Sequence, residues 1–480
     1  MDHATGRQLA EKIISSVQDN GIALGQLQML ESQGPNTNKT VWNIVNDVLV
    51  NLPNRNFGLT DIGTCNLHIC HNAFAKGLEM FGSSISEFVI DLHLWFKMCA
   101  ARREDCELVL EEMGLAKHKF LKHVECQWLS LQPAENHSTI LQSLLRILDQ
   151  MNGLKRCFLT VLPEKQSAST SNVRYIRIRR QLESKELVAQ IHFLVIVADI
   201  FNPFLKFFQT EVPLVHLLWD QLGILLTGLL GRFIRKDLLV NKAARKLSKI
   251  RLEELENHLA YSELEIGEQT CQEIEKLSEE KQKKFVLGAK SFLIAATKHL
   301  VNKLSLDNLI LRSSIVLKPD VRSEDWALKA IRILGKELQV SVDLDNLADE
   351  WRICHRENMP VDWHIETEEP WKPIRVDHFW RKVDELKDST GERKYPLIMK
   401  VVKTALVVGQ CSAEVELGFF ESGKSVIDDR VHLSEASNNG IHATSDGLKA
   451  FKCPGPSTRT FCTYHYAMRL VEEQKEKQDA

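Results

Sequence analysis

Apolar residues recur every three or four positions from residue 173 to about residue 338, and proline is scarce over this stretch. This spacing puts the apolar side chains on one face of a helix, which turns once in about 3.6 residues. A polar, serine-rich segment at 163–172 comes immediately before it and is typical of a linker. Because such helices must bury their apolar faces against one another, the middle of the chain is predicted to be an all-α region.

The first 150 residues mix two periodicities. Residues 6–19 carry Leu9, Ile13 and Val17 at helical spacing, and residues 71–81 and 85–106 have the same character. Residues 57–62, which carry Phe57, Leu59 and Ile62, are expected to form a strand that leads into Gly63. An order in which helices alternate with strands favours an α/β sheet in this part of the chain.

Composition excludes a strongly basic protein. The chain has 480 residues, which indicates more than one domain or one domain with a large insertion, and its formal net charge is −3. Binding to nucleic acid would therefore need a local basic patch. The 11 cysteines are scattered, and residues 1–4 lack the pattern of a signal peptide. Reduced thiols in a nuclear or cytoplasmic protein are expected.

One apolar stretch, residues 191–233, raises the question of a membrane span. Charged residues interrupt it at Asp199, Lys206 and Asp220, so that no apolar window of about 18 residues is expected to survive. We interpret the stretch as buried helices and expect no membrane partner.

Three separated segments carry a family resemblance. The first is a Cys-x-x-His motif at Cys65 and His68, directly after the expected strand. The second, residues 125–131, reads Glu-Cys-Gln-Trp-Leu-Ser-Leu around Trp128. The third, residues 412–433, contains Ser-Ala-x-x-Glu-x-x-Phe, and its distinctive residues are Glu416, Phe419, Gly423, Arg430 and Leu433. In this order they resemble the hAT superfamily of cut-and-paste transposases, closest to its intronless animal group.

The resemblance implies an α/β fold with an all-α insertion, in which a truncated RNase H-like core is split by a large helical domain. The first part of the core would span 1–150, with its first strands missing, and the insertion 151–390. Residues 391–450 would hold the end of the core and the hAT-type dimerisation segment, and 451–480 a C-terminal tail.

The same resemblance implies that the catalytic site is degenerate. RNase H-like transposases hold two Mg²⁺ ions with two Asp and one Glu. Residues 32–38 read Ser-Gln-Gly-Pro-Asn-Thr-Asn, so Gln33 stands where the family has an Asp, and the strand that carries the other Asp is expected to be missing. Glu416 alone remains as a relict, and no transposase activity and no resident metal are expected. The alternative is residual metal-dependent nuclease activity with Asp61 as a substitute ligand.

Three family-motif positions, Cys65, His68 and Trp128, have a second interpretation. Cys65 and His68 would pack inside the core, or they would bind zinc together with Cys70 and His71, although four ligands within seven residues crowd a tetrahedral ion. Trp128 would lie near a DNA end, as in active relatives, or serve as a core aromatic residue.

Two basic clusters are candidates for contact with DNA phosphates without sequence preference. The first cluster consists of Arg174, Arg177, Arg179 and Arg180. The second consists of Arg232, Arg235, Lys236, Lys242, Arg245, Lys246, Lys249 and Arg251. No zinc-finger spacing occurs that would add specificity. The alternative for residues 242–290 is a solvated helical face with Leu252, Leu255, Leu259 and Leu264 as its apolar seam.

Association is the last expectation. Residues 395–409 are more apolar than a short terminal segment can easily bury, so residues 395–450 are expected to form a homodimer interface, or else to pack on their own chain. Together these patterns predict a catalytically inactive, transposase-derived protein without a small-molecule substrate. It would be a dimerising or DNA-associated protein, with the nucleus preferred, or a decaying remnant.

Overall fold

The computed structural model describes residues 5–31, 36–53, 55, 57–82, 84–118, 140–165, 171–210, 212–360, 363 and 375–409. This part of the chain is 70% helical and contains no β-strand. Its two isolated bridges pair Ile234 with His258 and Lys387 with Arg393. The prediction of an α/β, RNase H-like core is therefore wrong for the residues that the structure describes.

The helices follow one another along the described chain. In the first third they are α1 (Gly6–Asp19), α2 (Asn36–Val50), α3 (Asn66–Phe81), α4 (Ser84–Lys97), α5 (Ala100–Glu112), α6 (Ile140–Asp149), α7 (Met151–Arg156) and α8 (Leu162–Glu164). In the middle they are α9 (Val173–Glu183), α10 (Leu187–Phe208), α11 (Val215–Leu230), α12 (Ala244–Leu247), α13 (Glu268–Ile274) and α14 (Glu279–Lys303). The last are α15 (Leu309–Ser313), α16 (Ala327–Glu337), α17 (Leu344–Arg356), α18 (Val376–Asp384) and α19 (Pro396–Leu406). The longest connection within the described chain leads from α11 to α13, and its only α-helix is the one-turn α12.

The expected strand at 57–62 is an extended segment without a partner strand. The buried guanidinium of Arg55 donates to the backbone carbonyls of Gly25, Phe57 and Gly58 at 2.8–3.0 Å. Asn46 accepts the Leu59 N–H at 2.8 Å. Side chains therefore satisfy three of the backbone groups that a sheet would pair, and the Thr60 N–H donates to the Gln28 carbonyl at 2.8 Å. Leu59 packs against buried residues of α1 and α2.

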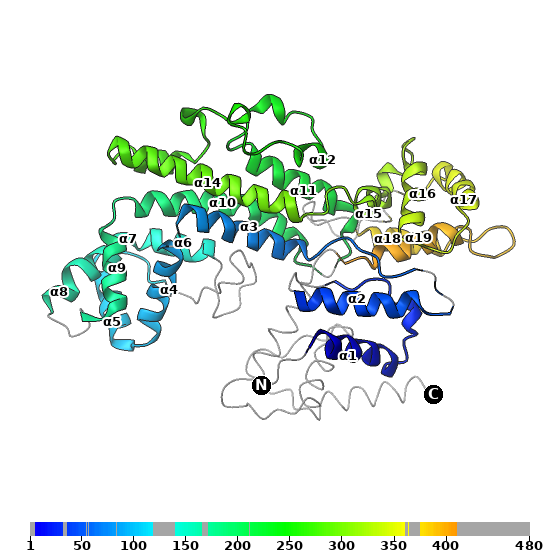
Figure 1. Cartoon of the computed structure of the whole chain (residues 1–480), viewed down its shortest axis with the longest axis horizontal. Helices are drawn as coiled ribbons and strands as arrows, with labels where there is room; N and C mark the ends of the chain where they lie inside the picture. The colour runs from blue at the N-terminus through cyan, green and yellow to red at the C-terminus, as the bar shows by residue number, and fades with distance from the viewer. Residues whose placement is uncertain are drawn as a thin grey trace. The chain divides into compact units, whose positions relative to one another are not determined.

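The longest helix contact in the described chain joins α3 to α14, beside α10 (Figure 1). Aromatic rings fill it: the centroids of Phe74 and Phe292 lie 5.3 Å apart, and those of Phe193 and Phe292 lie 5.6 Å apart. All three rings are buried. Helices from residues 66–81 and 279–303 thus share one core.

Helix α10 is long and apolar enough to cross a membrane, by length and composition alone. The expectation that the charged residues leave no apolar window of about 18 residues is wrong, and the helix continues through Asp199 and Lys206. These two residues and Pro203 are exposed and fall on one stripe of the helix, whereas 56% of its apolar window is buried in the structure. Because α10 packs against α3, α6, α11 and α13, we keep the interpretation of a core helix.

The apolar residues of 395–409 form α19, which packs against α16, α17 and α18. Ile398, Met399, Val401, Val402 and Ala405 are buried there, and Val407 remains 64% exposed. The carboxylate of Glu350 accepts the N–H groups of Leu397 and Ile398 at the start of α19. The described part of the expected dimer segment therefore packs on its own chain, and the homodimer stays a prediction.

Candidate functional site

Most residues of the expected transposase site lie outside the described residues. These are Gln33, Trp128, Glu416, Phe419 and Arg430. Asp61, the possible substitute ligand, is described: its carboxylate accepts the Gly63 N–H at 2.8 Å in a turn where Gly63 has φ 97°. Its visible role is to shape that turn.

Cys65 and His68 mark the start of α3, with Cys70 and His71 one turn further. Burial raises the pKa of the Cys70 thiol, and burial followed by the nearby His68 lowers the pKa of His71 to about 3. The described residues contain no group of three or more His, Cys, Asp or Glu side chains that could hold a metal ion. Cys65, Cys70 and His71 are buried, which agrees with core packing, and the rings of His68 and His71 meet edge to face at 6.1 Å.

The first basic cluster lies on α9, which an aromatic core fixes against α4. Tyr175 donates its hydroxyl to the Phe158 carbonyl at 2.8 Å, and the Trp95 and Tyr175 rings lie 5.8 Å apart. The same helix face directs Arg174 and Arg177 at Asp91 of α4, whose side chain is only 5% exposed. Arg174 Nε donates to Asp91 Oδ1 at 3.1 Å, and Arg177 donates to both carboxylate oxygens at 2.6 Å.

The four arginines of this cluster are therefore not equivalent. Arg174 and Arg177 are held by Asp91, and Arg179 pairs with Glu183 at 2.8 Å. Arg180 is exposed and makes no ion pair within the described part of the chain. A DNA surface built from all four, as the sequence predicted, would have to break structural ion pairs, so only Arg180 is available to a ligand.

The second basic cluster sits on a folded loop, residues 232–266, that leads from α11 to α13. Backbone bonds join its two ends: the Leu259 N–H donates to Phe233 at 2.8 Å, and the Arg235 N–H donates to Asn257 at 3.0 Å. The buried His258 ring bonds the Leu252 carbonyl at 2.8 Å. The expected helical seam over 242–290 is wrong in its first half, where Leu255 is 75% exposed and short turns replace a continuous helix.

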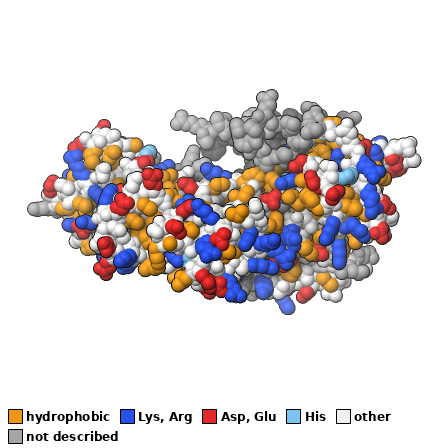
Figure 2. All heavy atoms as spheres, turned by 90° about the horizontal axis from the view of Figure 1, so that it is seen from above, with side chains coloured by type: hydrophobic (Ala, Val, Ile, Leu, Met, Phe, Trp, Pro, Cys, Tyr) orange, Lys and Arg blue, Asp and Glu red, His pale blue; other side chains and the backbone are white. Residues whose placement is uncertain are grey.

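Ion pairing divides this cluster as well. Arg235 pairs with Asp237, Arg245 with Asp307 and Arg251 with Glu254. Lys236, Lys242, Lys246 and Lys249 make no ion pair within the described residues. The same loop carries opposing charges at Glu256, Glu263 and Glu265. Figure 2 shows Lys and Arg side chains gathered near the middle of one face, among hydrophobic and acidic groups. The loop thus presents four ammonium groups to solvent or to a polyanion.

Sequence reasoning missed Asp91, whose carboxylate organises the first cluster. A signal was present, because Asp91 stands alone in the apolar helical stretch Phe-Val-Ile-Asp-Leu-His-Leu-Trp-Phe at 88–96. A lone carboxylate on an apolar face must be paired when buried. The sequence cannot say which of the 61 Lys and Arg residues provides the partner.

Comparison of the chain with models of known protein families gave no match, and comparison with curated protein sequences gave none.

Proposed function

We propose that this protein binds the phosphate backbone of DNA without sequence preference and without transposase chemistry. The observation that carries the proposal is the set of four unpaired lysines, Lys236, Lys242, Lys246 and Lys249, on the loop at 232–266. An ammonium group that no carboxylate neutralises gains the most from a phosphate, because it gives up no existing ion pair. The resemblance of the sequence motifs to hAT transposases makes DNA the polyanion to test first.

The proposal concerns affinity rather than base recognition. Lysine is a flexible point charge, and it positions a protein on the backbone without reading base edges. The net charge of −3 opposes binding by the molecule as a whole, so attraction must come from a local surface. Four phosphate contacts would give a slope of log Kd against log salt of about 3.6, at about 0.9 for each contact.

The test is fluorescence anisotropy with two unrelated duplexes and the full chain, over a series of salt concentrations. The variant Lys236→Gln/Lys242→Gln/Lys246→Gln/Lys249→Gln is expected to lower the salt slope by about 3 to 4 and to weaken both duplexes equally. A matched control, Lys76→Gln/Lys117→Gln/Arg156→Gln/Lys276→Gln, removes the same charge from cations that are exposed and ion-paired. Equal loss in both variants, or no binding by the unmodified chain at low salt, contradicts the proposal.

The absence of transposase chemistry is tested by a DNA cleavage assay. Incubation of supercoiled plasmid with the protein and Mg²⁺ or Mn²⁺ is expected to give no more nicking than a Glu416→Gln variant gives. Metal-dependent cleavage that disappears in this variant would restore the nuclease alternative.

A further inference from the structure

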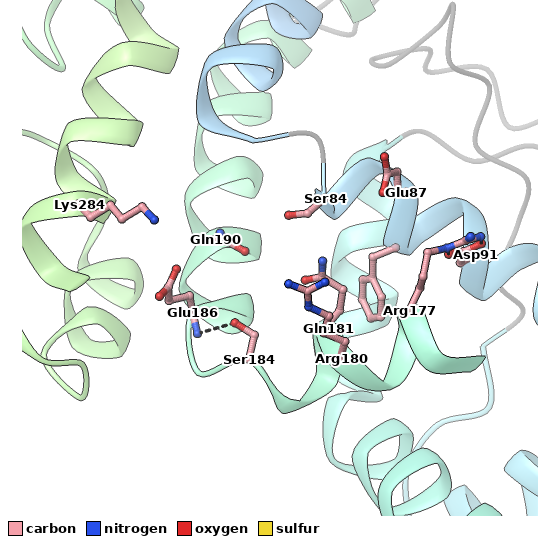
Figure 3. Close-up of a pocket in the computed structure, with 11 residues that line it drawn as sticks. Ser84, Glu87, Asp91, Arg177, Arg180, Gln181, Ser184, Glu186, Gln190 and Lys284 are labelled. Atoms are coloured by element: carbon pink, nitrogen blue, oxygen red, sulfur yellow. Dashed lines mark hydrogen bonds and ion pairs between the residues drawn. The ribbon is translucent and has the colours of Figure 1, made fainter. Parts of the chain in front are cut away.

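A polar cleft of about 530 Å³ opens between α4, α9, the beginning of α10 and α14. Figure 3 shows Arg177, Arg180 and Gln181 coming from α9, and Lys284 reaching toward them from α14 on the other side. Ser84 and Glu87 of α4 and Gln190 of α10 complete the polar lining, and Phe88 contributes an apolar wall. The volume lies within the range of small-molecule sites, about 300–1,000 Å³.

The charges of the cleft do not cancel once its internal ion pairs are assigned. Asp91 is held by Arg174 and Arg177 together. Glu186, which also lines the cleft, forms an ion pair at 3.1 Å with Lys281, which does not line it. Arg180 and Lys284 then remain without an ion pair among the described residues, and Glu87 is the lining carboxylate that has no ion pair there. The unneutralised cations come from two helices that are far apart in sequence, on opposite walls of one cavity.

We propose that this cleft binds a small phosphate monoester, with its phosphate group between Arg180 and Lys284. The planar guanidinium of Arg180 can donate two parallel hydrogen bonds to phosphate oxygens, and Lys284 adds a point charge from the other wall. Gln181, Gln190 and Ser84 supply neutral donors and acceptors for the remainder of the ligand, and Phe88 offers a face for a ring. A terminal phosphate enters a recessed site more easily than a phosphodiester within a duplex, so the site is separate from the DNA surface on residues 232–266.

The experiment is isothermal titration of the full chain with inorganic phosphate, with a nucleoside 5′-monophosphate and with the same nucleoside lacking phosphate. The monophosphate is expected to bind, inorganic phosphate to compete with it and the nucleoside to show no binding. A charge-assisted hydrogen-bond donor contributes about 1.5–3 kcal/mol, so Arg180→Gln should weaken binding by about 10- to 150-fold. Lys284→Gln should weaken it by a similar factor.

The matched control is Arg179→Gln, which removes the same charge from the neighbouring residue. Arg179 pairs with Glu183 and does not line the cleft, so its replacement should leave the affinity unchanged. Equal weakening by Arg179→Gln and Arg180→Gln would overturn the proposal, because it would mean general charge attraction. Absence of binding by the unmodified chain at about 10 mM monophosphate, where a millimolar site is about nine-tenths filled, would overturn it too. If the nucleoside binds as tightly as the monophosphate, the phosphate group does not contribute to binding and the proposal is wrong.

Discussion

Gly77 of α3 and Gly288 of α14 each face the opposite helix, and adding a methyl group is expected to have opposite effects at the two positions. A Cβ on Gly77 would lie 2.6 Å from Cε1 of Phe292, well inside contact distance. A Cβ on Gly288 would lie 3.4 Å from Cδ2 of Phe81, which is ordinary contact. The two substitutions are chemically identical and differ only in what the new methyl group meets.

The magnitudes follow from two opposing contributions. Glycine inside a helix costs about 1 kcal/mol relative to alanine, so both variants gain that amount from the helix itself. Overpacking a filled core costs about 1–3 kcal/mol. Phe292 is 0% exposed and its ring meets those of Phe74 and Phe193, so it has no free space into which to move. Gly77→Ala should therefore lower the free energy of unfolding by up to about 2 kcal/mol, and Gly288→Ala should raise it by up to about 1 kcal/mol.

Urea unfolding of the full chain, followed by circular dichroism, measures both values from the midpoints at constant slope. A double variant, Gly77→Ala/Phe292→Leu, provides the control: the smaller side chain should remove part of the clash, so the two changes should be less than additive. If Gly77→Ala raises the free energy of unfolding as Gly288→Ala does, or if the double variant is strictly additive, α3 and α14 do not approach one another as described.

Three further results are expected. Replacing both Arg174 and Arg177 with Gln should destabilise α4 and α9 by about 3–5 kcal/mol, because the Asp91 carboxylate, which is 5% exposed, loses both partners. The variant Asp91→Asn should cost less, because the two arginine side chains are 28% and 50% exposed and still reach water. Hydrogen exchange of the α4 and α9 amides measures the loss of stability in the two variants. A larger loss in Asp91→Asn than in the double arginine variant contradicts the reasoning. Burial raises the pKa of Glu350 above 4.5 in the folded protein. The stabilisation that Glu350 gives the folded state is therefore fully present below pH 4.5 and is lost as pH rises through the folded pKa. The stability of the unmodified chain relative to Glu350→Gln should fall over that window, and a difference that rises with pH is the contrary result. If residues 395–450 form a dimer, Val407→Glu at the 64%-exposed position should lower the mass seen by light scattering, and an unchanged dimer would place the interface elsewhere.

Helical periodicity was informative where apolar faces are long. The pattern over 173–338 lies largely in helices α9 to α16, and the helical spacing of residues 6–19 is α1. Short segments were ambiguous, since six residues such as 57–62 fit a strand or an irregular buried segment. In the structure the side chains of Arg55 and Asn46 take backbone groups of Phe57, Gly58 and Leu59. Asn46 lies 13 positions before Leu59, and the sequence does not show that the two meet.

For the candidate sites, the sequence does not show which of the cations form ion pairs. The sequence predicts two basic clusters, the second diluted by nearby acidic residues, yet three of four arginines in the first are ion-paired, two of them with one carboxylate 83 and 86 positions away. In the second cluster three arginines form ion pairs, Arg232 donates to the Glu265 carbonyl, and the lysines form none. A cation in an ion pair must exchange one partner for another, so it adds little to the binding of an anion, whereas an unpaired cation contributes its full attraction. Arg180 and Lys284 are an example, because they are distant in sequence and do not belong to the same basic cluster. Two such cations can form a phosphate site once ion pairs have occupied the charged residues around them.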